Sequence, residues 1–205
     1  DSITLIDRMD SLKATNPNTI PSVNGTKIVA LCGYNELGDC PAVYYRWDAE
    51  SSAGANDVDI VAVAGITTGR WMLINTFNET GIFDVRHAGC FPKNDDASVE
   101  VTQSYALQKA DTYAQKFNLT LFVPSIFDND NSYYIGTNIT IWSPIWFADG
   151  AKIVTATSLT LDILSERNVD RIHPFILHSA TNNGSINVAG DIVHSSWFEN
   201  TDTTN

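Results

Sequence analysis

Residues 138–156, NITIWSPIWFADGAKIVTA, hold three short runs of β-branched and aromatic residues. The runs ITIW, IWF and KIVT are separated by Ser143-Pro144 and by Asp149-Gly150, which are residue pairs typical of turns. Further short runs of this kind precede and follow the stretch, from LTLFV to DIVHSSWF. No helical pattern lies between them, which disfavours a doubly wound parallel sheet. A sandwich, a barrel and a parallel β-helix all remain open, because periodicity alone does not choose among them.

The segment before these strands has the clearest helical pattern in the chain. Residues 98–117 follow a polar loop, and one face repeats small or apolar side chains: Thr102, Ala106, Ala110, Tyr113, Ala114 and Phe117. We expect this helix to lie against another apolar surface.

The first third of the chain predicts a short helix followed by a compact β-module. Ile6, Met9 and Leu12 stand at helical spacing. From residue 27, the runs KIVALCGY and AVYYRWD predict a hairpin, and DIVAVAG leads through the turn ITTG to the strand RWMLI. In GITTGRW, two glycines allow the backbone to reverse, and we expect Trp71 to anchor the core of the module.

The composition excludes several classes of function. The chain has 205 residues and a formal net charge of -12, which argues against binding to nucleic acid or to an anionic membrane. No apolar run approaches the ~18 residues that would span a bilayer. Cys32 and Cys40 flank a short loop, and both a disulfide and unpaired thiols remain open for them. No zinc-type Cys/His spacing and no nucleotide-binding or serine-hydrolase motif occurs, so we expect no cofactor and no metal.

Paired carboxylates are the candidates for acid–base chemistry, and each pair has a structural interpretation as well. Asp95 and Asp96 precede the predicted helix, whose N-terminus they would stabilise. Asp57 and Asp59 stand at strand spacing on one face, beside a Gly/Asn/Ser loop, and are expected to be solvated. The segment DNDNS at residues 128–132 has alternating oxygen ligands but lacks the remaining features of a calcium loop, so we interpret it as a polar turn.

The order of these segments resembles the N-terminal part of phage tailspike proteins of the pectate-lyase-like, right-handed parallel β-helix superfamily. The matching text is LIDRMDSLKAT, IVALCGYNELGDCPAVYYRWD, GITTGRW, AGCFPKNDDASVEVTQSYALQKA, LTLFVPS, ITIWSPIWFADGAKI and HPFILHSATNNGSINVAGDIVHSSWF, which together run nearly end to end. Two segments depart from the family: its first glycine-rich loop is GDCPAV here, and its GDGVTDD loop is FPKNDDASVEV.

The resemblance implies a mainly β fold: a small N-terminal β-module followed by the capped start of a right-handed parallel β-helix. We expect a helical entry segment at residues 1–19, the β-module at 20–80, and helix-capped opening coils at 81–205. The helix at 98–117 would cover the open edge of the first coil, whose unpaired backbone would otherwise attract other strands.

The implied function is that of a viral tailspike or fibre component, located in the virion, with structural and host-surface glycan attachment roles. Its expected partners are a homotrimer of the chain, host-surface polysaccharide, and other virion or tail proteins. One alternative is a polysaccharide-degrading lyase or glycosidase; another is a virion-docking assembly module without glycan binding. We expect this chain to be a piece of a longer protein and to be noncatalytic; a full-length enzyme would be a polysaccharide depolymerase.

Aromatic side chains are the candidates for glycan contact, because exposed aromatic planes bind the apolar faces of sugar rings. The predicted binding residues are Tyr44, Trp47, Trp71 and Trp142. Core packing is the competing interpretation, above all for Trp47 and Trp71. Tyr44 and Tyr45 are neighbours on a predicted strand, so their side chains must face opposite sides.

Overall fold

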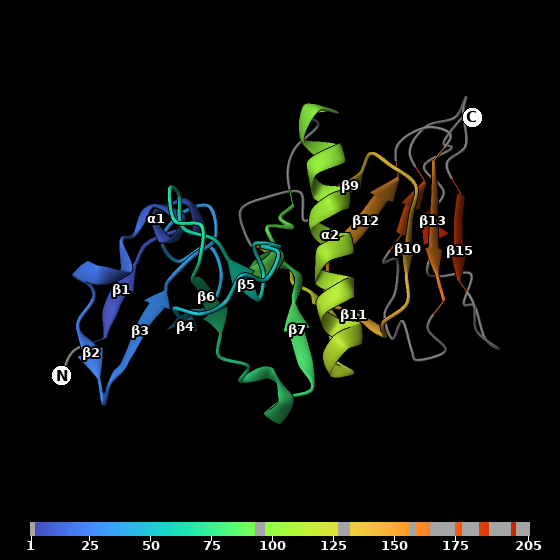
Figure 1. Cartoon of the computed structure of the whole chain (residues 1–205). Helices are drawn as coiled ribbons and strands as arrows, with labels where there is room; N and C mark the ends of the chain where they lie inside the picture. The colour runs from blue at the N-terminus through green and yellow to red at the C-terminus, as the bar shows by residue number, and fades with distance from the viewer. Residues whose placement is uncertain are drawn as a thin grey trace, which may run out of the picture. The chain divides into compact units, whose positions relative to one another are not determined.

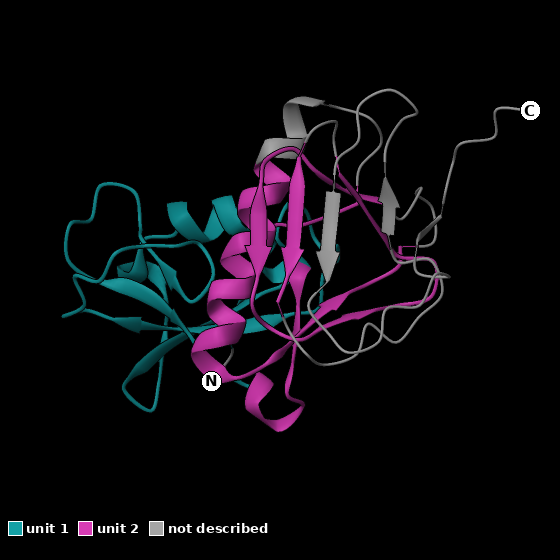
Figure 2. Cartoon of the chain, turned by 90° about the vertical axis from the view of Figure 1, so that its right-hand side faces the viewer, with its two compact units in different colours: residues 1–76, 86–88 teal, residues 77–85, 89–205 magenta. Residues whose placement is uncertain are grey.

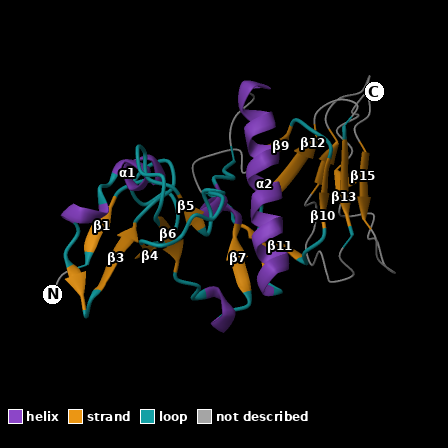
Figure 3. Cartoon of the chain, in the orientation of Figure 1, coloured by secondary structure: helices purple, strands orange, loops and turns teal. Residues whose placement is uncertain are grey.

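The computed structural model describes residues 3–92, 97–126, 132–155, 159–164, 175–177, 185–188 and 198–199, which are mainly β (Figures 1 and 3). The chain divides into two compact units (Figure 2), residues 1–76 with 86–88 and residues 77–85 with 89–205. Each unit has sheets of its own.

The first unit is built on a sheet of six strands in the order β1-β3-β4-β6-β5, with β2 paired to β3. The strands are β1 (Thr4–Ile6), β2 (Ser22–Val23), β3 (Thr26–Leu31), β4 (Val43–Asp48), β5 (Ile60–Val61) and β6 (Arg70–Leu73). Strands β1 and β3 are parallel, and the other pairs are antiparallel. One helix, α1 (Met9–Ala14), and a 3-10 turn, η1 (Pro17–Thr19), lie between β1 and β2.

The predicted N-terminal helix is shorter than the sequence pattern suggests. Met9 and Leu12 lie in α1, whereas Ile6 lies in β1 and pairs with Leu31 of β3. All three apolar side chains are buried. The spacing therefore marked the buried residues correctly, but pairing with a strand distant in sequence fixes Ile6 in an extended backbone.

The second unit is a parallel β-helix. After β7 (Ile82–Asp84), the chain runs through β8 (Thr120–Val123), β9 (Ser132–Ile135) and β10 (Ile139–Ile141), one strand in each of three sheets. It repeats this order with β11 (Ile145–Phe147), β12 (Lys152–Thr155) and β13 (Thr160–Ile163). The strands β14 (Phe175–Leu177), β15 (Ser185–Val188) and β16 (Phe198–Glu199) continue two of the sheets.

Every described strand pair in this unit is parallel. Paired residues are roughly 20 to 25 positions apart, except between β7 and β8, which have the long helix of this unit between them. Equivalent inward side chains therefore stack from coil to coil, as in Leu121 on Ile145 and Ile139 on Leu161. These four side chains are at most 3% exposed. Burying each such side chain contributes about 1.5–3 kcal/mol, so the stacks hold the coils together.

A long helix, α2 (Ala97–Phe117), covers the first coil. Strands β9 and β10 each stand last in their sheets, and α2 packs on both of them. Ala106, Ala110 and Ala114 of the predicted apolar face are buried, whereas Thr102 at its start is exposed. The structure thus supports the expected role of the helix as a cap. Two 3-10 turns, η2 (Phe77–Glu79) and η3 (Val85–Ala88), flank β7.

Candidate functional site

The four predicted aromatic residues do not form one site. Tyr44, Trp47 and Trp71 belong to the first unit, and Trp142 belongs to the second. Tyr44 is 41% exposed and Trp142 is 60% exposed, whereas Trp47 is half-buried and Trp71 has no exposed surface.

Trp71 is a core residue. It stands opposite Trp47 on β4 and opposite Val61 on β5, and the two indole rings meet edge to face with centroids 5.2 Å apart. Gly69 has φ of +107°, and a Cβ there would overlap the Trp47 ring. In GITTGRW, Gly69 therefore leaves room for the indole of Trp47, and Trp71 places its own indole in the core. With its ring fully enclosed, Trp71 has no surface to offer a ligand.

Tyr44 and Tyr45 face opposite sides of the sheet, as strand alternation requires. Tyr45 is 1% exposed, and its hydroxyl donates a hydrogen bond to the carbonyl oxygen of Val58. Tyr44 lies on the open side, in register with Ala30 of β3. Of the two rings, only that of Tyr44 is available to a ligand.

Trp142 lies in the turn between β10 and β11, and α2 holds that turn in place. The carboxylate of Asp111, which is 2% exposed, accepts hydrogen bonds from the backbone N–H groups of Trp142 and Ser143 at 3.2 and 2.8 Å. The side chain of Gln115 donates a further bond of 2.7 Å to the same carboxylate. The backbone beneath the exposed indole is thus fixed by a buried, charge-assisted network.

Ser104, two helical turns before Asp111, holds the preceding turn in the same way. Its hydroxyl accepts hydrogen bonds from the backbone N–H groups of Gly136 and Thr137 at 2.8 and 3.2 Å. Sequence reasoning missed both helix residues. The available signal was a polar side chain recurring after seven residues on the apolar face of a helix.

A second aromatic pair lies on the outward side of a β-helix sheet. Phe122 of β8 and Trp146 of β11 are in register, and their ring centroids are 5.0 Å apart. Both side chains are half-buried, so they present less surface than Trp142.

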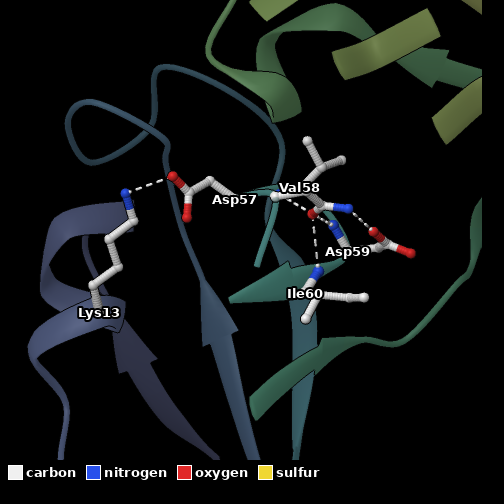
Figure 4. A network of polar contacts seen from close by, with 6 residues as sticks. Lys13, Asp57, Val58, Asp59 and Ile60 are labelled. Atoms are coloured by element: carbon white, nitrogen blue, oxygen red, sulfur yellow. Dashed lines mark hydrogen bonds and ion pairs between the residues drawn. The ribbon is translucent and has the colours of Figure 1, made fainter. Parts of the chain in front are cut away.

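The carboxylates around β5 have structural partners (Figure 4). The Lys13 ammonium of α1 forms an ion pair of 2.9 Å with Asp57, a residue whose φ is +59°. The side-chain oxygen of Asn56 accepts hydrogen bonds from the backbone N–H groups of residues 58–60, and its amide nitrogen donates to Asp59. Asp59 is 8% exposed, so it is not solvated as the sequence suggested. Both carboxylates are therefore engaged in contacts that hold this part of the first unit together.

The remaining candidates give no reactive centre in the part of the chain that the structure describes. Cys32, Cys40 and Cys90 form no disulfide. Burial, and then the charge of Asp84, raises the pKa of Cys90 well above its usual range. The described residues hold no group of three or more side chains suited to a metal ion, and no described helix is long and apolar enough to cross a membrane. The predicted carboxylates at 95–96 and 128–130 lie outside the described residues.

No protein-family model and no curated protein matches this chain. Solved structures do match. The tailspike protein gp49 from Acinetobacter baumannii bacteriophage Fri1, a capsular polysaccharide depolymerase, is 14% identical with a TM-score of 0.55, over 93% of this chain and 36% of that protein. WceF of Pantoea stewartii, a glycan biofilm modifying enzyme with a bacteriophage tailspike-like parallel β-helix fold, is 12% identical with a TM-score of 0.56, over 93% and 28%.

The enzymatically active domain of tailspike protein 2 of bacteriophage CBA120 is 12% identical with a TM-score of 0.53, over 91% of this chain and 26% of that one. The chain thus spans between 26% and 36% of the length of these three proteins. Sequence identities of 12% to 14% support a shared architecture only. With its module of mainly antiparallel strands and its helix-covered parallel coils, the chain has the fold of tailspike-like parallel β-helix proteins.

Proposed function

We propose that this chain is part of a viral tailspike or fibre protein that attaches to glycans on the host surface. The observation that carries the proposal is the structural match to tailspikes over more than nine-tenths of this chain. In keeping with that role, the assembled protein would be a homotrimer in the virion, joined to other tail proteins.

Trp142 is the residue we propose for glycan contact in the second unit. Its ring is 60% exposed, and the buried Asp111 fixes its backbone, so little ordering is lost when a sugar ring stacks on it. Aromatic contacts are worth about 0.5–1.5 kcal/mol beyond the area they bury, which corresponds to roughly tenfold in affinity at the upper end.

The test is binding of the chain to a panel of purified capsular and cell-wall polysaccharides, measured by biolayer interferometry. We expect Trp142→Ala to weaken binding about tenfold and Trp142→Phe to retain most of it. Tyr105→Ala is the matched control, because Tyr105 is also an exposed aromatic residue, at 55%, but lies on α2. An unchanged affinity in Trp142→Ala would remove Trp142 from the proposal. Absence of binding to every glycan, with co-purification of a tail protein, would replace attachment by an assembly role.

A second candidate function is cleavage of the glycan. It is favoured by the description of gp49 as a depolymerase and of WceF as a glycan-modifying enzyme. Incubation of the same polysaccharides with the chain, followed by assays for new reducing ends and for unsaturated sugars, separates the two candidates. Release of either product by the chain would establish catalysis, and binding without release would support attachment.

A further inference from the structure

One side of the sheet in the first unit carries apolar side chains that are not enclosed. Cross-strand register places Leu5, Ala30 and Tyr44 in one row and Ile28, Arg46, Met72 and Ile60 in the next. We call this set the outer sheet face. Leu5 is 73% and Tyr44 41% exposed, and Ile28, Met72 and Ile60 are half-buried. The small Ala30, which lies between Leu5 and Tyr44, is buried. Exposed apolar surface gathered on one face marks a place where another molecule binds.

Arg46 stands in the middle of the outer sheet face with its charge unpaired. Its side chain is exposed, and within the described residues it has neither a hydrogen bond nor an ion pair. Two other arginines of the first unit are engaged: Arg70 donates to the carbonyl oxygens of Ala53 and Gly69, and Arg86 donates to that of Asp39. In a chain of net charge -12, a guanidinium on an apolar face without a partner among the described residues is unusual, and it is available to bind an anionic group.

Tyr44 and Arg46 are two residues apart on β4, so their side chains rise from the same side of the sheet about 6.6–6.8 Å from each other. The aromatic ring offers a plane for the apolar side of a sugar. The guanidinium offers a planar pair of donors whose geometry matches a carboxylate. Met72, in register with Arg46, continues the apolar surface onto β6.

We propose that the outer sheet face binds an acidic sugar residue, with its ring on Tyr44 and its carboxylate on Arg46. The proposal deepens the attachment function proposed above and rests on it. The charge of Arg46 selects this occupant over a neutral sugar, because a neutral ligand would leave the guanidinium without a partner. The one carboxylate of β4 on the same face, that of Asp48, already accepts a hydrogen bond from the backbone N–H of Glu50 at 3.2 Å. It lies beyond Arg46, on the side away from Tyr44.

The experiment compares four carboxylated polysaccharides with their carboxyl-reduced forms: hyaluronan, alginate, polygalacturonate and polysialic acid. We expect the chain to bind at least one of the four, to bind its reduced form at least threefold more weakly, and to lose affinity as salt is raised. Arg46→Gln should weaken binding to the acidic form by the same factor and remove its preference over the reduced form. Arg46→Lys should fall between the two, since an ammonium keeps the charge without the planar pair of donors.

Arg8→Gln is the matched control, because Arg8 is also exposed and its loss changes the net charge equally, but it stands at the N-cap position of α1 and not on β4. It should leave binding unchanged. Circular dichroism and size-exclusion chromatography of each variant check that fold and oligomeric state are retained.

Equal affinity for all acidic and reduced pairs, or equal loss in Arg8→Gln and Arg46→Gln, would overturn the proposal. A change of oligomeric state in Arg46→Gln without a change in glycan affinity would assign the face to a second copy of the chain and overturn it too. Binding to neutral glycans only would refute this inference while leaving the attachment function standing. Binding to no glycan at all would refute both.

Discussion

Replacing Gly69 by alanine tests whether the turn before β6 needs glycine for two separate reasons. The first reason is its backbone, since a φ of +107° is strained for any residue with a Cβ. The second is the ring of Trp47, which a Cβ at this position would overlap. The hydrogen bond from the Gly69 N–H to the carbonyl oxygen of Ser51, 2.7 Å long, resists any shift of the backbone that would relieve the overlap.

The two costs can be estimated separately. Backbone strain of this kind costs about 1–3 kcal/mol, and overpacking costs typically about 1–3 kcal/mol. Trp47 is only half-buried, so its ring can move partly aside, which places the second cost toward the lower end. We therefore expect Gly69→Ala to lower the free energy of unfolding by about 2 kcal/mol, with about half from the strain and half from the overlap.

Gly25→Ala is the matched control. Gly25 has φ of +79°, and a Cβ there meets nothing within 4 Å, so only the strain applies and the expected loss is about 1 kcal/mol. The contribution of the overlap is measured by repeating Gly69→Ala in a Trp47→Ala background, where the loss should fall to that of Gly25→Ala.

The assay is urea unfolding of the chain, followed by near-ultraviolet circular dichroism and tryptophan fluorescence. The reasoning would be refuted if Gly69→Ala and Gly25→Ala had equal effects. It would also be refuted if removing the Trp47 ring left the effect of Gly69→Ala unchanged.

Three further predictions concern single buried or paired groups. Asp111→Asn should lower the free energy of unfolding by about 1.5–3 kcal/mol in urea titrations, because backbone N–H groups that now share a carboxylate lose an acceptor; an effect below about 0.5 kcal/mol would contradict this. Burial raises the pKa of Cys90 above the ordinary value of 9.0, so the stability that its neutral thiol contributes is complete below pH 9 and declines as the pH rises further. At pH 8 a thiol reagent should therefore modify the part-exposed Cys32 while Cys90 stays unmodified until the protein unfolds, and rapid labelling of native Cys90 would count against its burial. Lys13→Met should cost at most about 1 kcal/mol, less at high salt, because the ion pair with Asp57 is about one-third exposed, and a loss that salt does not reduce would argue against an electrostatic origin.

The parallel β-helix was predictable from the order of short strand runs together with the resemblance, but not from periodicity alone. The run TLDI marks a strand by alternation, since Leu161 and Ile163 are buried and the residues between them are part-exposed. The run KIVT marks one by its β-branched residues, which are buried without alternation. The pairing of β1 with β3 could not be predicted, since nothing in the run TLI distinguishes a strand from the start of a helix. The pairing of β1 with β3, a strand distant in sequence, determines that this run is extended.

The candidate site was predictable only in part. Strand alternation shows which side chains share a face, but it does not show which face is buried. The sequence required that one of Tyr44 and Tyr45 face outward. Because Tyr45 is buried, Tyr44 is the residue that faces outward. The sequence around Trp71 does not distinguish it from an exposed tryptophan, except that Gly69, two residues earlier, indicates close packing. The support of Trp142 by Asp111 spans 31 residues, a separation at which sequence carries no contact information.

The hydrogen bonds from α2 to the turns of the first coil also bear on how the later coils find their places. Because each later strand of the coils copies its register from the strand before it, a slip by one residue at the beginning would be inherited along the stack and would turn apolar side chains outward. Ser104 and Asp111 bind backbone groups at two fixed points, so a slipped first coil would lose both sets of hydrogen bonds together. The helix therefore stabilises the correct register of the first coil relative to a slipped one, and the later coils take their register from it.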